Sequence, residues 1–445
     1  MKFLEHIHSH YKECRIRFAG LICIVLISFS TKAQPEDSLP FHLSLEECIV
    51  YAVNHQPYVQ QARIDEAITE RSIKSKLSAW YPQINLGYTI QHYLQMPATT
   101  NPTAVKNSSI TTASLTQTIF NSDVLLVSKT AGDVRLNARQ NTQLSKIDIV
   151  VDVSKSFYNV LITGMQIEML NGDIVQLQKS LKDALSQYQA GTVDKTDYQR
   201  ATISLNNALA SRKQYEEQLK SSLALLKQQM GYNGREELIL VYNDQKLRDE
   251  IILDTTGVPS YQSRVEYQRL ETQQRLLHYN LKYAKWSYLP AISLFGNYNL
   301  VGQNNAFSKI YDAGYPNSLV GLTLSVPIFQ GTKRIQGIKK AELQLRRLDW
   351  DFQNLKAAID TGYISAIARY KTSLNDYIVS KDNLSLTKEV YNTIQLQYKT
   401  GISSYLNVII AYTDLRTAEV NSLNALYQVL SSKLDVQKAA GTINY

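Results

Sequence analysis

The sequence predicts a mainly α protein with a small antiparallel β membrane part, built from a duplicated helix-strand-strand-helix-helix unit. First, residues 187–201 return in altered form as residues 397–411, roughly 210 positions later, and each copy contains one central glycine. Second, all ten prolines lie outside the two longest stretches with helical spacing, and an interior proline costs a helix about 3 kcal/mol. Third, four short stretches alternate apolar and polar residues, which is typical of strands.

Residues 1–33 have the layout of a secretory signal peptide. Basic residues precede an apolar run at 18–29, and Ala33 offers a small residue for cleavage. A membrane anchor is the disfavoured alternative, because the run has about 12 residues where a spanning helix needs about 20. Lipidation at Cys23 is also disfavoured, because Ile22 stands where lipoproteins usually have a small residue. We therefore expect an exported chain.

The exported chain divides into two repeats and a connector. The first repeat is expected at 34–232 and the second repeat at 259–445. The connector between them, an equatorial region, is expected at 233–258. The first helix should begin at a capping box, in which Ser44 precedes Glu47 by three residues.

Two long helical hairpins are expected, at about 121–230 and 330–440. Their apolar residues recur every three or four positions, and the first helix alone would have about 70 residues and extend roughly 105 Å. Glycine readily adopts the positive φ at which a helix ends. We therefore expect the first hairpin to turn at Gly191 and the second at Gly401.

Four strands of about nine residues are expected at 83–91, 112–120, 291–300 and 318–328, the second being the weakest because Gln117 interrupts its apolar face. Tilted strands of this length match a bilayer, and one-sided apolar faces match a barrel wall between lipid and water. Four strands cannot close, because the smallest membrane barrels have about eight. Copies of the chain must then share a barrel: two would give eight strands and a filled lumen, three would give twelve strands and a passage.

We expect no enzyme activity, no metal site and no cofactor. The sequence contains no Gly-rich phosphate loop, no paired-His helix and no Cys/His metal spacing. Its formal net charge of +8 is mild for 445 residues and does not by itself predict a nucleic-acid partner.

A basic run opens the second long helix. It consists of Lys333, Arg334, Lys339, Lys340, Arg346 and Arg347. The run could contact acidic lipid headgroups, since the preceding strand has a membrane-type apolar face. The simpler alternative is an ordinary solvated helix face.

In this order, the features resemble the TolC family of outer-membrane efflux proteins over nearly the whole mature chain. The motifs that carry the resemblance are Tyr81-Pro82, Leu289-Pro290, Val326-Pro327-Ile328-Phe329 and the Tyr-x-x-Gly turns ending at Gly191 and Gly401. Phe120 ends a segment in which the family usually has a proline. The resemblance implies a homotrimer, with a twelve-stranded barrel in the outer membrane continued by a long α-helical barrel in the periplasm. Such proteins are passive ducts supplied by a periplasmic adaptor protein and an inner-membrane pump.

The resemblance also implies roles for residues at the two turns. The adaptor would dock at the tips, Ala190, Gly191, Thr192, Thr400, Gly401 and Ile402. The periplasmic gate would comprise Asp197 and Tyr398, which match positions that hold the closed entrance, with Ser403, Asn407 and Ile410. Ser403 stands where the family has an arginine, and Asn407 and Ile410 stand where it has two aspartates. These departures predict a weaker charge-based latch and a less cation-selective mouth.

A secreted or periplasmic coiled-coil scaffold without a pore is the alternative from another class. It explains the long helices but not the four strands with lipid-type alternation. A periplasmic helical enzyme is less favoured still, because no polar constellation is present to carry its chemistry.

Overall fold

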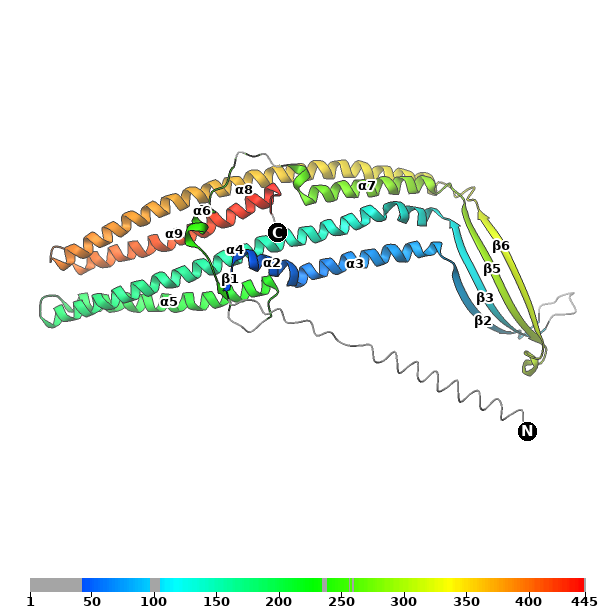
Figure 1. Cartoon of the computed structure of the whole chain (residues 1–445), viewed down its shortest axis with the longest axis horizontal. Helices are drawn as coiled ribbons and strands as arrows, with labels where there is room; N and C mark the ends of the chain where they lie inside the picture. The colour runs from blue at the N-terminus through cyan, green and yellow to red at the C-terminus, as the bar shows by residue number, and fades with distance from the viewer. Residues whose placement is uncertain (1–41, 97–104, 234–237, 256, 258–259, 444–445) are drawn as a thin grey trace, which may run out of the picture. The chain divides into compact units, whose positions relative to one another are not determined.

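The structure is a computed structural model that describes residues 42–96, 105–233, 238–255, 257 and 260–443. The expected signal peptide at 1–33 lies outside these residues. The unit Leu43–Tyr445 is mainly helical, as predicted. Within it, a four-stranded sheet lies at one end of the long helices and two helical turns lie at the other (Figure 1). Among the described residues, no helix has both the length and the apolarity needed to cross a membrane.

The first half of the chain begins with a short strand and two helices. The elements in order are β1 (His42–Leu43), α2 (Leu45–His55), α3 (Pro57–Leu77), η1 (Ser78–Trp80), β2 (Gln83–His92), β3 (Asn107–Phe120), α4 (Ser122–Gln189) and α5 (Lys195–Met230). The capping box that starts α2 is confirmed: Ser44 Oγ accepts from the Glu47 N–H at 3.3 Å, and the Glu47 carboxylate accepts from the Ser44 N–H at 2.7 Å. Pro57 occupies the first position of α3, where its missing N–H has no intrahelical partner to lose.

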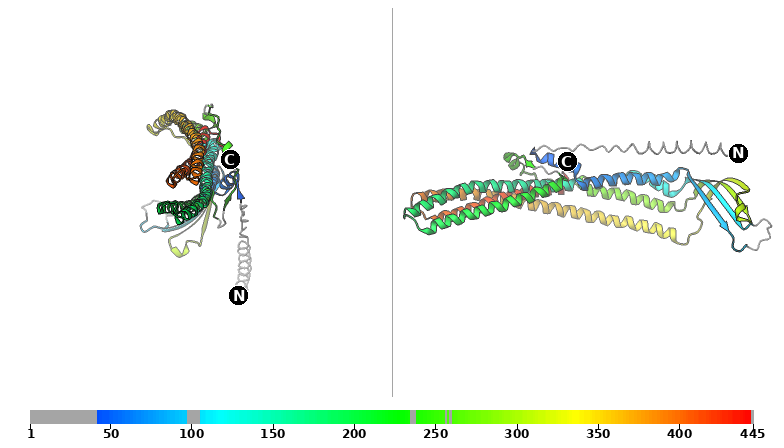
Figure 2. Two further views of the ribbon diagram at one scale, coloured as in Figure 1. Left: turned by 90° about the vertical axis from the view of Figure 1, so that its left-hand side faces the viewer. Right: turned by 90° about the horizontal axis from the view of Figure 1, so that it is seen from below.

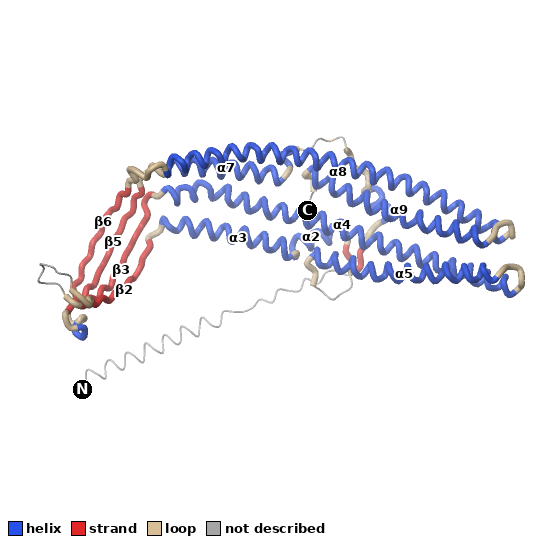
Figure 3. The backbone as a smooth tube through the Cα atoms, turned by 180° about the vertical axis from the view of Figure 1, so that it is seen from behind, coloured by secondary structure: helices blue, strands red, loops and turns tan. Residues whose placement is uncertain are grey.

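The second half repeats this order of long elements. Its elements are β4 (Ile239–Leu240), α6 (Asp244–Asp249), η2 (Tyr261–Ser263), α7 (Val265–Trp286), β5 (Ala291–Asn304), η3 (Phe307–Lys309), β6 (Gly314–Ser325), α8 (Lys333–Lys399) and α9 (Tyr405–Ala440). The two longest helices, α4 and α8, have 68 and 67 residues, and both run from the sheet to the turns (Figure 3).

The sheet is antiparallel throughout and has the order β2-β3-β5-β6. Its register places Ile84, Leu115 and Val320 in one row of one face, and Leu86 in the next row of that face. Ile84 and Leu86 are 74% and 77% exposed. None of the residues of the four strands is Asp, Glu, Lys or Arg. One face is therefore apolar and open, and the whole sheet is uncharged.

The opposite face of the sheet is polar and partly cross-linked by side chains. Thr112 donates to Asn299 Oδ1 at 2.7 Å, and Asn299 Nδ2 donates to Asn317 Oδ1 at 2.8 Å. These residues lie side by side on β3, β5 and β6, so a row of hydrogen bonds crosses three strands.

Several predicted strand limits were wrong. The strand expected at 112–120 begins at Asn107, and the one expected at 291–300 continues to Asn304. The strand expected at 318–328 is β6, which begins at Gly314 and ends at Ser325. The alternation of apolar residues continues past this end, but Pro327 has no N–H to donate to a ladder.

The long helices form a layer whose order changes along its length. Near the sheet, neighbours in the layer are α3-α4-α7-α8, and near the turns they are α5-α4-α9-α8. The two views in Figure 2 show this layer along and across its length. In a single chain, α3 and α8 therefore border the layer near the sheet, just as β2 and β6 border the sheet.

Three tyrosines spaced seven residues apart on α8 bind the segment that joins the repeats. Tyr370 donates to the Ile251 carbonyl at 2.8 Å and accepts from the Leu253 N–H at 3.0 Å. Tyr363 donates to the Gly257 carbonyl at 2.6 Å, and Tyr377 accepts from Arg248 at 3.2 Å. The backbone of this connecting segment is thus anchored to the middle of α8.

Candidate functional site

The turn that joins α4 to α5 and the turn that joins α8 to α9 have the same backbone geometry. Gly191 has a φ of 74° and Gly401 a φ of 79°, the left-handed conformation that glycine adopts without strain. In the first turn the Thr192 N–H donates to the Gln187 carbonyl at 3.0 Å, and in the second the Ile402 N–H donates to the residue at the matching place at 2.9 Å. These bonds are typical of a helix ended by a C-terminal glycine. All six predicted tip residues are exposed.

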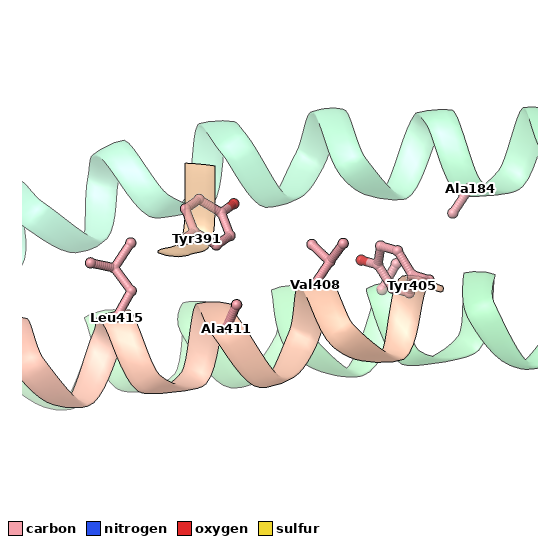
Figure 4. Packing of buried hydrophobic residues seen from close by; sticks show 7 residues of the cluster. Ala184, Tyr391, Tyr405, Val408, Ala411 and Leu415 are labelled. Atoms are coloured by element: carbon pink, nitrogen blue, oxygen red, sulfur yellow. The ribbon is translucent and has the colours of Figure 1, made fainter. Parts of the chain in front are cut away.

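An apolar cluster packs the two hairpins together just inside the turns. Its buried members come from four helices: Ala184, Ala201, Tyr391, Tyr405, Val408, Ala411 and Leu415. Figure 4 shows Tyr391 and Tyr405 pointing into the space between α9 and its neighbours. Small residues at Ala184, Ala201 and Ala411 let the helices approach closely around these rings. The tips therefore stand on a packed base.

Tyr398 links the two hairpins across this cluster. Its hydroxyl donates to Gln187 Oε1 on α4 at 2.9 Å, and its ring lies 5.4 Å from that of Tyr405. Burial, with smaller contributions from the Asp197 and Asp183 charges, raises the pKa of Tyr398. The hydroxyl is thus protonated at neutral pH and available as a donor.

Asp197 lies half-buried in the first turn of α5. No side-chain hydrogen bond or ion pair of Asp197 is present among the described residues, so within one chain Tyr398 is bonded to Gln187 instead. The backbone N–H of Asp197 donates to the Asp194 carbonyl at 3.1 Å. Gln187 occupies the first position of the repeated segment but was not among the predicted gate residues.

The remaining predicted gate residues are on or next to the first turns of α9. Asn407 Nδ2 donates to Ser403 Oγ at 3.1 Å, so these two polar side chains satisfy each other. Ile410 is 51% exposed and is apolar. The structure therefore brings Ser403 and Asn407 together, without a charged partner for either.

A second polar link, which the sequence analysis missed, lies farther from the tips. Arg416 on α9 lies 3.7 Å from the Asp173 carboxylate on α4, and Tyr412 donates to that carboxylate at 3.4 Å. Glu419 lies nearby; burial, reinforced by the Asp173 charge and opposed by Arg416 and Lys388, raises its pKa to about 7. One arginine thus stands against two partly buried carboxyl groups. The only signal in the sequence is that Asp173 and Arg416 lie at similar distances from their turns.

In the part of the chain that the structure describes, no three or more His, Cys, Asp or Glu side chains gather so as to hold a metal ion. The contacts described at the turns are hydrogen bonds and ring contacts, and the Arg416–Asp173 ion pair lies farther along the helices. Such contacts hold helices together and can be broken when helices move apart.

The sequence profile of the outer membrane efflux proteins matches residues 49–232 and 262–442. The outer membrane protein TolC of Escherichia coli is 22% identical over 95% of this chain and 86% of its own length. The solvent efflux pump outer membrane protein SrpC of Pseudomonas putida is 22% identical over 66% of this chain and 63% of its own length. The crystal structure of the Campylobacter jejuni CmeC outer membrane channel superposes with a TM-score of 0.72 at 15% identity, covering 89% of this chain and 85% of CmeC. The profile match covers both halves of the chain, and so the chain belongs to the outer membrane efflux protein family, as a TolC-type member.

Proposed function

We propose that this protein is an outer-membrane channel that passively conducts substrates out of the cell, without enzyme activity or a cofactor. The observation that carries the proposal is the uncharged sheet with one open apolar face. Lipid is the environment that such a face fits, because apolar side chains on a barrel exterior face the acyl chains and the polar face lines water. The efflux proteins to which the chain is similar support the same assignment.

The sheet is complete only when copies join. β2 and β6 each have one unpaired edge in a single chain, and unpaired backbone groups are costly in lipid. Three copies give a twelve-stranded barrel wide enough for a passage, which favours a homotrimer over a dimer. Aromatic side chains support the membrane position, because exposed Tyr81 and Tyr288 lie at one end of the sheet and exposed Tyr311 lies at the other, where its hydroxyl is hydrogen-bonded to that of Tyr88.

The helical part would extend into the periplasm as an α-helical barrel, after export directed by residues 1–33. At its end, the exposed tips around Gly191 and Gly401 form the surface for a periplasmic adaptor protein, through which an inner-membrane pump would act. The left-handed glycine at each tip gives the two hairpins the same ending, so the adaptor would meet two similar surfaces per chain.

The gate would lie just inside the tips. Asp197, Tyr398, Ser403, Asn407 and Ile410 are its proposed residues. Asn407 and Ile410 provide no carboxylate ring, and rings of Asp or Glu are what bias a pore toward cations. We therefore propose a gate held closed mainly by packing and neutral hydrogen bonds, with weak cation selectivity.

Conductance in planar bilayers tests the channel and its gate together. The purified protein should require detergent, form a trimer and give discrete conductance steps. Replacing both Asp197 and Tyr398 with Ala should raise the open probability, whereas Tyr427→Ala, in the other half of α9, serves as the control. Unchanged open times in the double variant would remove these residues from the gate. A protein that stays monomeric in aqueous solution without detergent would instead favour the coiled-coil scaffold.

A further inference from the structure

Two shallow surface hollows lie on the helices that border the layer near the sheet. The α8 hollow is lined by Gln336, Lys339, Lys340, Leu343, Gln344 and Arg347. The α3 hollow includes Ile64, Ile68, Arg71 and Lys76. Neither hollow has a carboxylate in its lining. Each therefore combines aliphatic side chains with positive charge alone.

The two hollows lie at similar distances from the sheet-side ends of their helices. α3 runs toward the sheet and ends at Leu77, whereas α8 starts at Lys333 and runs away from it. Arg71 and Lys339 each lie six residues from these helix ends, or about 9 Å at 1.5 Å per residue. The headgroup layer of a bilayer extends about 5–8 Å beyond the hydrocarbon on each side. Long basic side chains can extend from these positions toward the headgroups.

The charges in these hollows are largely unneutralised. Among the described residues, no ion pair involves Lys339, Lys340, Arg71 or Lys76. Arg347 has only Asp351, 4.0 Å away on the same helix. Cations that lack acidic partners on both bordering helices would repel one another if the helices were brought together.

In the proposed trimer, α8 of one copy meets α3 of the next, because each is the outer helix of its layer. Closing the barrel would thus place Lys339 and Lys340 of one subunit near the Arg71 and Lys76 positions of its neighbour. We infer that each of these seams binds the phosphate headgroup of an anionic phospholipid from the periplasmic leaflet. This inference rests on the proposed function. The lipid would supply the negative charge that the linings of the two hollows lack, and would fasten neighbouring subunits at the membrane surface.

Fluorescence quenching by brominated phospholipids tests the lipid site and the membrane position separately. Trp80 ends η1, the short helix that follows α3, and is exposed, so a full-length chain with Trp286→Phe and Trp350→Phe reports from this place. It would be reconstituted in vesicles of phosphatidylcholine with increasing phosphatidylglycerol, with one or the other lipid brominated. The Lys339→Gln/Lys340→Gln variant is compared with Lys371→Gln/Lys381→Gln, which removes two exposed lysines more than 30 residues farther along α8.

Quenching of Trp80 by both brominated lipids is expected, with phosphatidylglycerol preferred. A cation at a membrane surface contributes about 1 kcal/mol, or about fivefold, to binding of anionic lipid. The preference should fall at least about fivefold in Lys339→Gln/Lys340→Gln and stay unchanged in the control variant, with both variants trimeric. Equal quenching by the two lipids in the parent chain, or a preference that survives Lys339→Gln/Lys340→Gln, would overturn the lipid site while the channel stands. Absence of quenching by either lipid would overturn both the membrane position and the lipid site.

Discussion

Replacing Tyr370 with Phe should release the connecting segment from α8 without disturbing the helices. The Tyr370 side chain is 2% exposed, and its hydroxyl satisfies two backbone groups, the Ile251 carbonyl and the Leu253 N–H. Ile251 is buried, so its carbonyl would remain without a donor, at a cost of about 1–3 kcal/mol. Leu253 is half-buried, and water can replace the hydroxyl there at small cost.

We therefore expect the segment to open about 5 to 150 times more often in Tyr370→Phe, since 1.4 kcal/mol corresponds to a factor of ten. Hydrogen exchange of peptides covering residues 248–255 measures this opening directly. Tyr391→Phe is the matched control, because Tyr391 is also buried on α8 but lies near the turns and not at this segment. Exchange that is as slow in Tyr370→Phe as in the parent chain, or equally fast in both variants, would refute the reasoning.

Three further outcomes follow from the structure. The pKa of Glu419 is raised from 4.5 to about 7, so the stability that its protonated form adds is present below about pH 4.5 and is lost as pH rises toward 7. Exchange protection of the α4–α9 contact, corrected for intrinsic rates, should fall across this window, and Glu419→Gln should reduce the fall. Asp173, whose pKa burial also raises, should account for the remainder. Gly401→Ala should lower the thermal midpoint of unfolding by an amount equivalent to about 1 kcal/mol, because φ is 79° there. Gly337→Ala, inside α8 with open space around it, should raise the midpoint or leave it unchanged. The opposite order would contradict the strain argument. Leu86→Lys on the apolar face should reduce recovery of trimer from the membrane fraction, because a lysine facing lipid costs about 2–4 kcal/mol of stability. Thr89→Lys on the other face should not reduce this recovery. Equal recovery of the two variants would argue against lipid on the apolar face.

The mainly α class could be predicted from the sequence because long helices are indicated by the three- and four-residue spacing of apolar residues and by the absence of proline. Strand ends were less predictable. Apolar alternation continues through Val326 and Ile328, but β6 stops at Ser325, since pairing depends on backbone donors that side-chain patterns do not report. The start of β3 at Asn107, five residues before the predicted start, was also not predictable from the pattern. Asn107 and Ser109 are buried polar residues, and their positions are fixed by residues that are close in space but distant in sequence.

The contacts of the candidate site were harder to predict than its location. The repeated segment pointed to the turns, but the partner of Tyr398 is Gln187, on a helix 211 positions away in sequence. No local period specifies such a pair. Tyr363, Tyr370 and Tyr377 are spaced seven residues apart in the sequence, but the groups that their hydroxyls bind became apparent only in three dimensions.

The two borders of each chain are chemically different: β2 and α3 form one, and β6 and α8 the other. The interfaces in a ring of such subunits are heterologous, so every subunit uses both of its borders and the ring closes only if all borders are intact. A chain damaged at a single border would still pair correctly through the other and would enter assemblies it cannot close. In the proposed trimer, an equal mixture of intact and damaged chains would leave only about one ring in eight free of damage, so such a defect would act as a dominant one.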